Sequence, residues 1–396
     1  METQTTNLSK RSYYEATSGR LTIEDAIGYL EEEVKIRSFR EKLERFYKGQ
    51  NLRQTLVDGL MRNAPDSNRE SVEKRVRTWL NNDKFYAVKK QDAIELCFIL
   101  ELSIEEADQF VTMVSEEALH WRNPDEIVYI FALNHRMEYR RAQELEQQMA
   151  TLLANVTEKK TLEEDSFTPV IRREISALGS EEELAEYLQQ AAPRLGRRHN
   201  TAYDFFMERL AVLEHPQQDE ETAKAHIFEP EHLSIREILK EYMFSGNVLY
   251  AKKLVKKAKK ESADIPPEEK MVFTEIQKNI SSSWPEETTI SKMKQRKEDV
   301  TRKVLILLFL ATDQGLGPEE DEEEEYGQEP TVDDVFEDLC QRLNDMLISC
   351  GYSELDPRAP FDWLILYCMC VQDMPELDMR MRRIFKEMFG EQESGS

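Results

Sequence analysis

Histidine and cysteine are the side chains whose spacing most often reveals metal or covalent chemistry, and neither type falls into such a pattern here. The six histidines include no His-x-x-x-His or His-Glu-x-x-His pair. Among the five cysteines, Cys368 and Cys370 lie in the apolar run WLILYCMCV, with no further Cys or His at zinc-ligand spacing. We therefore predict no metal and no cofactor, and interpret the cysteines as buried thiols of a protein in a reducing compartment.

Motifs of enzymes are missing as well. The sequence has no G-x-x-x-x-G-K-[ST] phosphate loop, no G-x-G-x-x-G and no G-x-S-x-G. One polar cluster, RRHN at 197–200, follows a glycine and could bind a ligand, although Asn200 also suits a helix cap. We predict that the chain is not an enzyme.

Basic side chains are concentrated in one segment of an acidic chain. The whole sequence carries a formal charge of −25, whereas residues 35–90 contain fifteen Lys or Arg against seven acids, a net charge of +8. A basic island in an acidic protein is typical of a surface that meets phosphate, and a solvated helical face is the alternative.

The spacing within residues 68–82 favours the first of these interpretations. Val72, Val76, Trp79 and Leu80 recur at helical spacing and form one apolar stripe. Seen down a helix, the opposite face presents Glu70, Ser71, Lys74, Arg77, Thr78 and Asn81, while Arg75 lies at the flank. Such a face fits the major groove of DNA.

The segment RVRTWLNNDKFYAVKKQDAIELCFILELSIEEADQFV resembles the second half of the lambda-repressor-like (Cro-type) helix-turn-helix domain. The matching features are Arg77-Thr78-Trp79, Asn81-Asn82, the apolar Ala93, Ile94 and Leu96, and the run from Leu100 to Ala107. The following LHWRNPDEIVYIFALNHRMEYRRAQEL is similar to an extension of some bacterial members. The resemblance covers residues 39–148 and implies a five-helix DNA-binding domain in a bacterial, sequence-specific transcription regulator.

Two features depart from that family. The second helix reads LRQTLV in place of the family's T-Q-x-x-L-A, and RNAPDSN makes a longer turn before the third helix than the motif usually has. The alternative is therefore a non-enzymatic helical adaptor that keeps the repressor-like fold for protein contacts.

If the domain binds DNA, helix N-terminal residues meet base edges and flanking cations meet phosphates. The predicted DNA-binding residues are Asn68, Arg69, Ser71, Lys74, Arg77, Thr78, Asn81, Lys84, Lys89 and Lys90. Arg53 and Arg62 on the preceding helix are open to either interpretation. Double-stranded DNA is the expected partner, with a homodimer and a protein partner of the C-terminal helices as further expectations.

Periodicity along the rest of the chain predicts an all-α fold, a repressor-like domain followed by a helical-bundle C-terminal region. Capping boxes should start helices after Thr22, Ser67, Ser103, Ser180 and Ser234. The predicted divisions are an arm and helix at 1–34, the helix-turn-helix domain with its extension at 35–155, a linker at 156–169, and helical domains at 170–280 and 281–396.

Neither a membrane span nor a secretion signal is evident, so we expect a cytoplasmic protein. The runs VLILLFLAT and WLILYCMCV are too short to cross a bilayer and should be central helices of a bundle, with Phe309, Phe361 and Trp363 in the core. The acidic loop at 317–334 holds ten acids and no base, and we interpret it as a solvated insertion or as a mimic of nucleic acid. Residues 252–260 hold six Lys and no acid, which indicates a solvated face, or a second phosphate contact or acidic-partner site.

Overall fold

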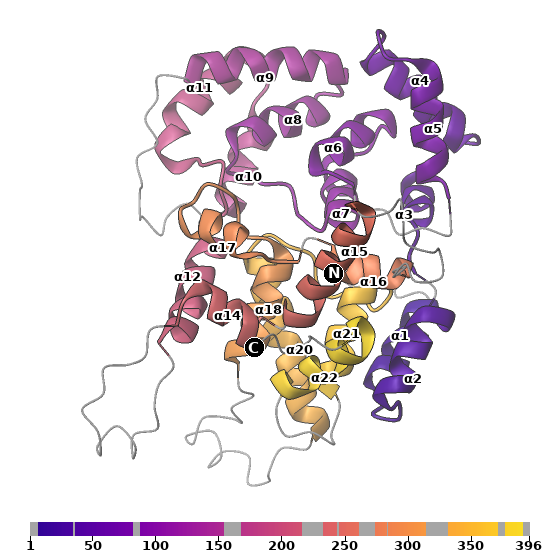
Figure 1. Ribbon diagram of the computed structural model, residues 1–396. Helices are drawn as coiled ribbons and strands as arrows, with labels where there is room; N and C mark the ends of the chain where they lie inside the picture. Colours follow the sequence, from indigo (N-terminus) through magenta and orange to yellow (C-terminus); the bar gives the residue numbers. More distant parts are fainter. Residues whose placement is uncertain are drawn as a thin grey trace. The chain divides into compact units, whose positions relative to one another are not determined.

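The computed structural model in Figure 1 describes residues 7–34, 36–81, 88–153, 168–215, 233–243, 245–260, 274–282, 284–313, 332–370 and 377–390. These residues form helices and contain no strand, apart from one isolated bridge between Glu117 and Tyr352. The fold is therefore all-α, as the periodicity predicts. Among the described residues, no helix has both the length and the apolar character needed to cross a membrane.

The chain divides into two compact units, which we call the 37–200 unit and the terminal unit. The 37–200 unit comprises Arg37–Asn200 and Gly351–Ser353, and the terminal unit comprises Met1–Ile36, Thr201–Cys350 and Glu354–Ser396. The helices of the 37–200 unit are α3 (Phe39–Phe46), α4 (Leu52–Asn63), α5 (Arg69–Trp79), α6 (Lys90–Ile99), α7 (Ile104–Ser115), α8 (Pro124–Asn134), α9 (Tyr139–Leu153), α10 (Thr168–Ala177), α11 (Glu181–Ala191) and the 3-10 helix η2 (Ala192–Arg194).

One apolar core holds the 37–200 unit together. Helix α4 packs against α5 and α6, and α3 packs against α7. In α5, Val76 and Trp79 are buried and Val72 and Leu80 are half-buried against the same core, so the predicted stripe is confirmed. Phe39 of α3 meets Trp79 edge to face, with 5.7 Å between the ring centroids. The buried stripe fixes which side of α5 faces outward.

Helix starts agree with the capping boxes at most of the predicted positions. At Thr22, Ser103 and Ser234 both reciprocal bonds are present, and Ser180 accepts from the Glu183 amide. The prediction at Ser67 was wrong, because the cap is the next residue. Asn68 accepts from the amides of Glu70 and Ser71 at 2.8 and 3.3 Å. A carboxamide oxygen can serve both amides, which explains why Asn68 and not Ser67 starts the helix.

The division into units differs from the predicted domains. Helices α10 and α11, predicted to belong with later helices, share the core of the 37–200 unit through Ile171, Ile175, Leu184 and Leu188. Helix α10 packs on α8, and helix α11 packs on both α8 and α9. Residues 1–34, predicted as a separate arm, belong to the terminal unit.

The terminal unit combines the N-terminal helices with the helices that follow Asn200. Its helices are α1 (Asn7–Thr17), α2 (Ile23–Gly28), the π-helical turn η1 (Tyr29–Glu33), α12 (Asn200–Glu214), α14 (Ile235–Glu241), α15 (Ser245–Lys260), α16 (Glu275–Ser281), α17 (Glu287–Lys294), α18 (Arg302–Thr312), α20 (Val332–Ser349), α21 (Pro360–Cys370) and α22 (Leu377–Phe389). Helix α1 packs on α21, where the Trp363 indole N–H donates to the Ser12 carbonyl at 2.9 Å and the Ser12 hydroxyl donates to the Pro357 carbonyl at 2.7 Å.

Helices α18 and α21 form the interior of the terminal unit, as predicted for the two apolar runs. Phe309, Phe361 and Trp363 are all buried. A buried ion pair joins the two helices, because the Arg302 guanidinium donates to both Asp362 carboxylate oxygens at 2.8 Å.

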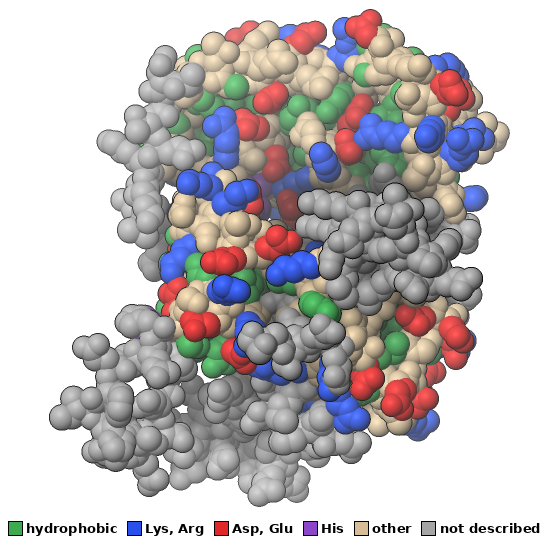
Figure 2. All heavy atoms as spheres, viewed as in Figure 1, with side chains coloured by type: hydrophobic (Ala, Val, Ile, Leu, Met, Phe, Trp, Pro, Cys, Tyr) green, Lys and Arg blue, Asp and Glu red, His purple; other side chains and the backbone are tan. Residues whose placement is uncertain are grey.

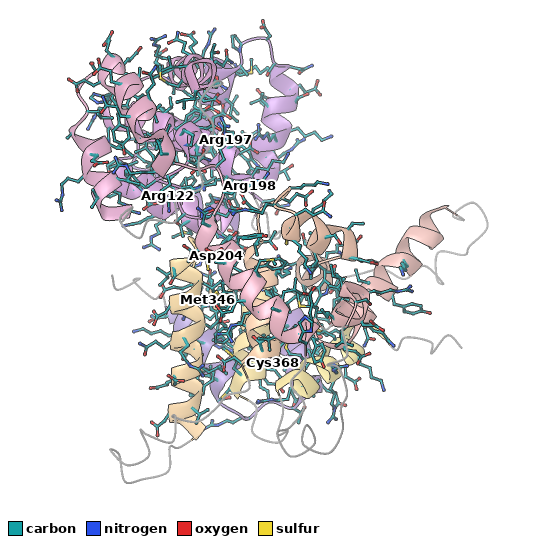
Figure 3. All side chains as sticks on the ribbon, turned by 90° about the vertical axis from the view of Figure 1, so that its left-hand side faces the viewer. Arg122, Arg197, Arg198, Asp204, Met346 and Cys368 are labelled. Carbon is teal, nitrogen blue, oxygen red and sulfur yellow. The ribbon has the colours of Figure 1, made fainter. Side chains whose placement is uncertain are left out.

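All five cysteines are buried and none forms a disulfide, which confirms their interpretation as buried thiols. Cys368, labelled in Figure 3, lies within α21. Burial raises the pKa of the Cys340 thiol to about 12 and that of the Cys350 thiol to about 11. These thiols are therefore protonated and unreactive near neutral pH.

Residues 156–167 of the predicted linker, and 317–331 of the acidic loop, lie outside the described residues. Thr168 and Pro169, predicted as the end of the linker, instead form the first turn of α10.

Candidate functional site

The outward face of α5 is exposed, as the spacing of its polar residues predicts. Ser71, Lys74 and Arg77 are all exposed, and Lys and Arg side chains gather over α4 and α5 in Figure 2. Among the described residues, no carboxylate lies within ion-pair distance of Lys74 or Arg77. These two cations are therefore open to an external anion.

The N-terminus of α5 is engaged in contacts within the unit. The side-chain oxygen of Asn68 caps the helix, as described above. Arg69 lies 3.1 Å from the Glu73 carboxylate and 3.6 Å from that of Asp58, although more than half of its side chain is exposed. A contact from Arg69 to DNA would have to compete with these acids.

Thr78 and Asn81 lie towards the C-terminal end of the same face. Thr78 is half-buried as a residue, and its hydroxyl donates to the Lys74 carbonyl at 3.0 Å. Asn81 is exposed just beyond the helix. Lys84 lies outside the described residues.

Lys89 and Lys90 differ in spite of their adjacency. Lys89 is exposed at the start of α6. The Lys90 side chain is only 15% exposed and its ammonium lies 2.9 Å from the Glu126 carboxylate. Lys90 is thus bound to α8 within the unit, and the structure does not bring it together with Lys74 and Arg77.

Arg75, at the flank of α5, has a structural role. Its guanidinium stacks 4.4 Å from the centroid of the Trp79 ring and pairs with Asp92 of α6 at 2.9 Å. These contacts connect α5 to the helix that follows it.

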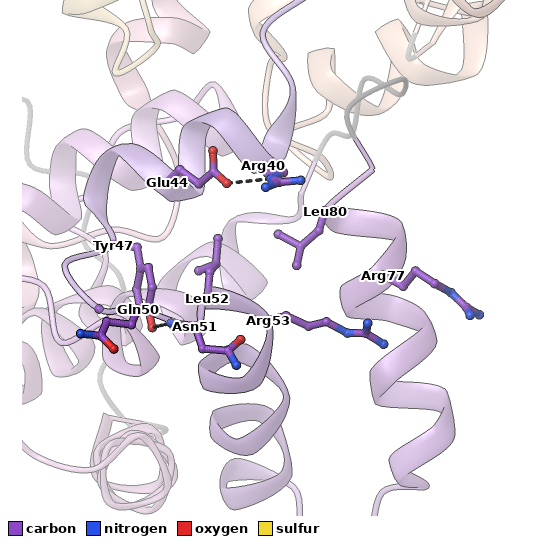
Figure 4. Close-up of a pocket in the computed structure, with 10 residues that line it drawn as sticks. Arg40, Glu44, Tyr47, Gln50, Asn51, Leu52, Arg53, Arg77 and Leu80 are labelled. Atoms are coloured by element: carbon purple, nitrogen blue, oxygen red, sulfur yellow. Dashed lines mark hydrogen bonds and ion pairs between the residues drawn. The ribbon is translucent and has the colours of Figure 1, made fainter.

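A groove beside α5 brings together basic residues from three helices (Figure 4). Its volume is about 620 Å³, and its basic residues are Arg40 of α3, Arg53 of α4 and Arg77. Arg40 pairs with Glu44 at 2.7 Å, whereas no described carboxylate pairs with Arg53. In Figure 4, Arg53 extends towards α5 and the Arg77 guanidinium points away from the other residues of the groove. The basic face thus continues from α5 to the first turn of α4.

Sequence reasoning left Arg53 open to either interpretation and gave Arg40 no role. Both belong to the basic island at 35–90, which is the signal that could have singled them out. Their position at a groove with Arg77 depends on how α3, α4 and α5 pack, and helical spacing within one helix does not reveal that.

The RRHN cluster makes contacts within the 37–200 unit. Arg197 donates twice to the Asp125 carboxylate, at 2.7 and 3.1 Å, and Arg122, which Figure 3 labels together with Arg197 and Arg198, donates to the Arg194 carbonyl. The rings of His199 and His120 stack 4.0 Å apart. These contacts connect η2 and the residues after it to α8 and to the segment before α8.

Burial determines the protonation of the stacked histidines. It lowers the pKa of His120 to about 2, with the charges of His199, Lys90 and Arg122 acting in the same direction. Burial and the Lys90 charge lower the pKa of His199 to about 4. Both imidazoles are therefore neutral at physiological pH.

Comparisons with family models, with curated proteins and with solved structures found no match to this chain.

Proposed function

We propose that the protein is a sequence-specific DNA-binding regulator whose helix α5 enters the major groove. The observation that carries the proposal is the outward face of α5, where Ser71, Lys74 and Arg77 are exposed and the two cations have no acid partner among the described residues. Exposed cations without internal partners are available to phosphates and to base edges.

The neighbouring helices support the same proposal. Arg53 lies at the first turn of α4 and borders the groove that includes Arg77. Lys89 is exposed at the start of α6. In this arrangement Ser71, Lys74 and Arg77 contact base edges, while Arg53 and Lys89 contact phosphates and fix the orientation of the duplex. Arg69 has a smaller role because Glu73 and Asp58 already bind it.

The helices outside the 37–200 unit have a separate role in this proposal. We propose that the terminal unit senses a ligand or mediates dimerisation. We also propose that the protein acts in the cytoplasm of a bacterium. Duplex DNA is the partner, and the adaptor function is the outcome expected if DNA binding is absent.

Reversal of charge on α5 tests the proposal. Lys74→Glu with Arg77→Glu should lower affinity for DNA at least about 100-fold, because each lost contact is worth about 1–3 kcal/mol and the new acids repel phosphate. The change in affinity is measured by fluorescence anisotropy, with a labelled genomic duplex that binds the wild-type protein.

A matched control separates a local effect from one of net charge. Arg140→Glu with Arg173→Glu makes the same change of charge at exposed positions of α9 and α10 in the same unit. This variant should bind DNA nearly as the wild type does. Equal affinities of the two double variants would contradict the proposal and favour the adaptor.

A further inference from the structure

A second basic cavity lies in the terminal unit, between α14, α15 and the start of α17. Its volume is about 430 Å³, within the range of cavities that hold small ligands. The cavity is lined by Arg236, Leu239, Lys240, Gly246, Leu249, Tyr250, Lys252, Lys253, Glu286 and Glu287. All of these residues belong to the terminal unit, so the cavity is independent of α5.

Spacing along the two helices explains why these residues share a cavity. Arg236 and Lys240 are four residues apart on α14 and lie on one face of it. On α15, Gly246, Leu249, Tyr250 and Lys253 follow the i, i+3, i+4, i+7 pattern of a single helical face. Because α14 packs against both α15 and α17, the two faces border the same space.

Two cations of the cavity have no acid partner among the residues that the structure describes. Glu286 and Glu287 belong to the lining, yet among the described residues no carboxylate lies within ion-pair distance of Arg236 or Lys253. The one described carboxylate within ion-pair distance of Lys240 is that of its neighbour Glu241, at 3.7 Å, and the side chains of that pair are 68% and 47% exposed. Glu237 is engaged as the cap partner of Ser234. The cations therefore outnumber the carboxylates around a concave surface, which favours a multiply charged anion.

Apolar and aromatic groups make up the rest of the lining. Leu239 is buried, and Leu249 and Tyr250 are half-buried beside the cations. A ring such as that of Tyr250 offers a stacking face to a planar group.

From this combination we propose that the cavity binds a small phosphate-bearing molecule with a planar apolar part, a nucleoside diphosphate or a close relative. Lys240 and Lys253 hold the phosphates from opposite helices, Arg236 adds positive charge, and Tyr250 and Leu249 contact the base. This would give the terminal unit a ligand to sense, and the binding itself does not depend on DNA.

Calorimetric titration of the full chain with ADP, and separately with inorganic pyrophosphate, tests the proposal at low salt. Lys240→Gln with Lys253→Gln should weaken both probes at least about 10-fold. Lys10→Gln with Arg383→Gln removes the same charge at exposed positions of the same unit and should leave binding unchanged. Tyr250→Ala should weaken ADP about 10-fold and leave pyrophosphate unaffected.

Several results would overturn the proposal. Absence of heat with both probes at millimolar concentration, or unchanged binding in Lys240→Gln with Lys253→Gln, contradicts the cavity as the site. If Tyr250→Ala weakens the binding of ADP and of pyrophosphate equally, the proposed contact between Tyr250 and a planar group of the ligand is contradicted. Because Lys74→Glu with Arg77→Glu should retain full ADP binding, a failure of DNA binding and a failure of this site are distinguishable.

Discussion

Ion pairing separates the basic side chains of α5 into two groups. Arg69 and Arg75 are bound to Glu73, Asp58 and Asp92, whereas Lys74 and Arg77 face outward without a described acid partner. A sequence count gives these four cations equal weight, although only the second pair can bind an external anion without first breaking an ion pair. This difference is the reason that Lys74 and Arg77 carry the proposed function.

The buried pair of Arg302 and Asp362 leads to a prediction of stability. Both side chains are about 5% exposed, so Arg302→Met leaves a buried carboxylate without its cation and should cost about 3–5 kcal/mol. Arg11→Met, which removes an exposed pair with Glu33 in the same unit, should cost less than about 1 kcal/mol. Urea denaturation measures both free energies of unfolding. Equal losses would show that burial does not set the strength of the pair.

The stacked histidines lead to a pH prediction. The unfolded chain protonates each imidazole near the ordinary pKa of 6.5, whereas in the fold the pKa of His120 is lowered to about 2 and that of His199 to about 4. Between pH 6.5 and pH 4 the unfolded state therefore binds more protons, and the 37–200 unit loses stability as the pH falls.

Replacement of both rings tests this dependence. Between pH 7 and pH 5, His120→Phe with His199→Phe should lose about 4 kcal/mol less stability than the wild type loses, because each imidazole contributes about 2 kcal/mol over this range. Denaturation midpoints of the two proteins at the two pH values give the comparison. Parallel losses in both would mean that other groups dominate the acid sensitivity.

At the scale of the elements, local chemistry made the helices predictable. Helices α2, α7 and α14 begin directly after the predicted capping boxes of Thr22, Ser103 and Ser234, because a cap acts within a few residues of sequence. The prediction of a cap at Ser67 was wrong for an equally local reason, because the adjacent Asn68 accepts from the amides of the first turn. Exposure of Lys74 and Arg77 follows from the stripe of Val76 and Trp79 on the opposite face.

Contacts between distant helices could not be predicted in this way. Ser12 bonds to the carbonyl of Pro357, and Trp363 bonds to the carbonyl of Ser12, across about 350 positions of sequence. Likewise, Arg53 and Arg77 border one groove only because α4 and α5 pack together. Helical periodicity does not encode contacts between distant helices. The groove at α5 and the position of α1 therefore become visible only in the three-dimensional structure.

Close packing of α4 on α6 leads to a prediction of its own. A Cβ atom added at Gly59 would lie 2.5 Å from Ile99, so Gly59→Ala should force α6 to shift and cost about 1–3 kcal/mol. Gly28 of α2 has open space at the same position, and Gly28→Ala should instead stabilise its helix by about 0.5–1 kcal/mol. Thermal unfolding of the two variants should show shifts of opposite sign. A gain of stability in both would contradict the close approach at Gly59.

For the whole molecule, charge distribution limits how DNA is approached. A protein with a formal charge of −25 is repelled by a duplex except where its basic face is presented. Binding should therefore depend steeply on salt. Phosphate contacts by Arg53 and Lys89 would give a log–log slope of about −2, and Arg53→Glu with Lys89→Glu should bring that slope close to zero.

Anisotropy titrations at several salt concentrations provide that slope. The control variant Arg140→Glu with Arg173→Glu should keep the wild-type value. If the wild-type affinity has a log–log salt slope near zero, these cations do not contact phosphates.

Selection of bound fragments from a random duplex library, with the full chain as bait, tests most directly whether the outward face of α5 reads DNA. The wild type should enrich one defined sequence over successive rounds, and Lys74→Glu with Arg77→Glu should enrich none. Enrichment of the same sequence by both proteins, or by neither, would contradict the account.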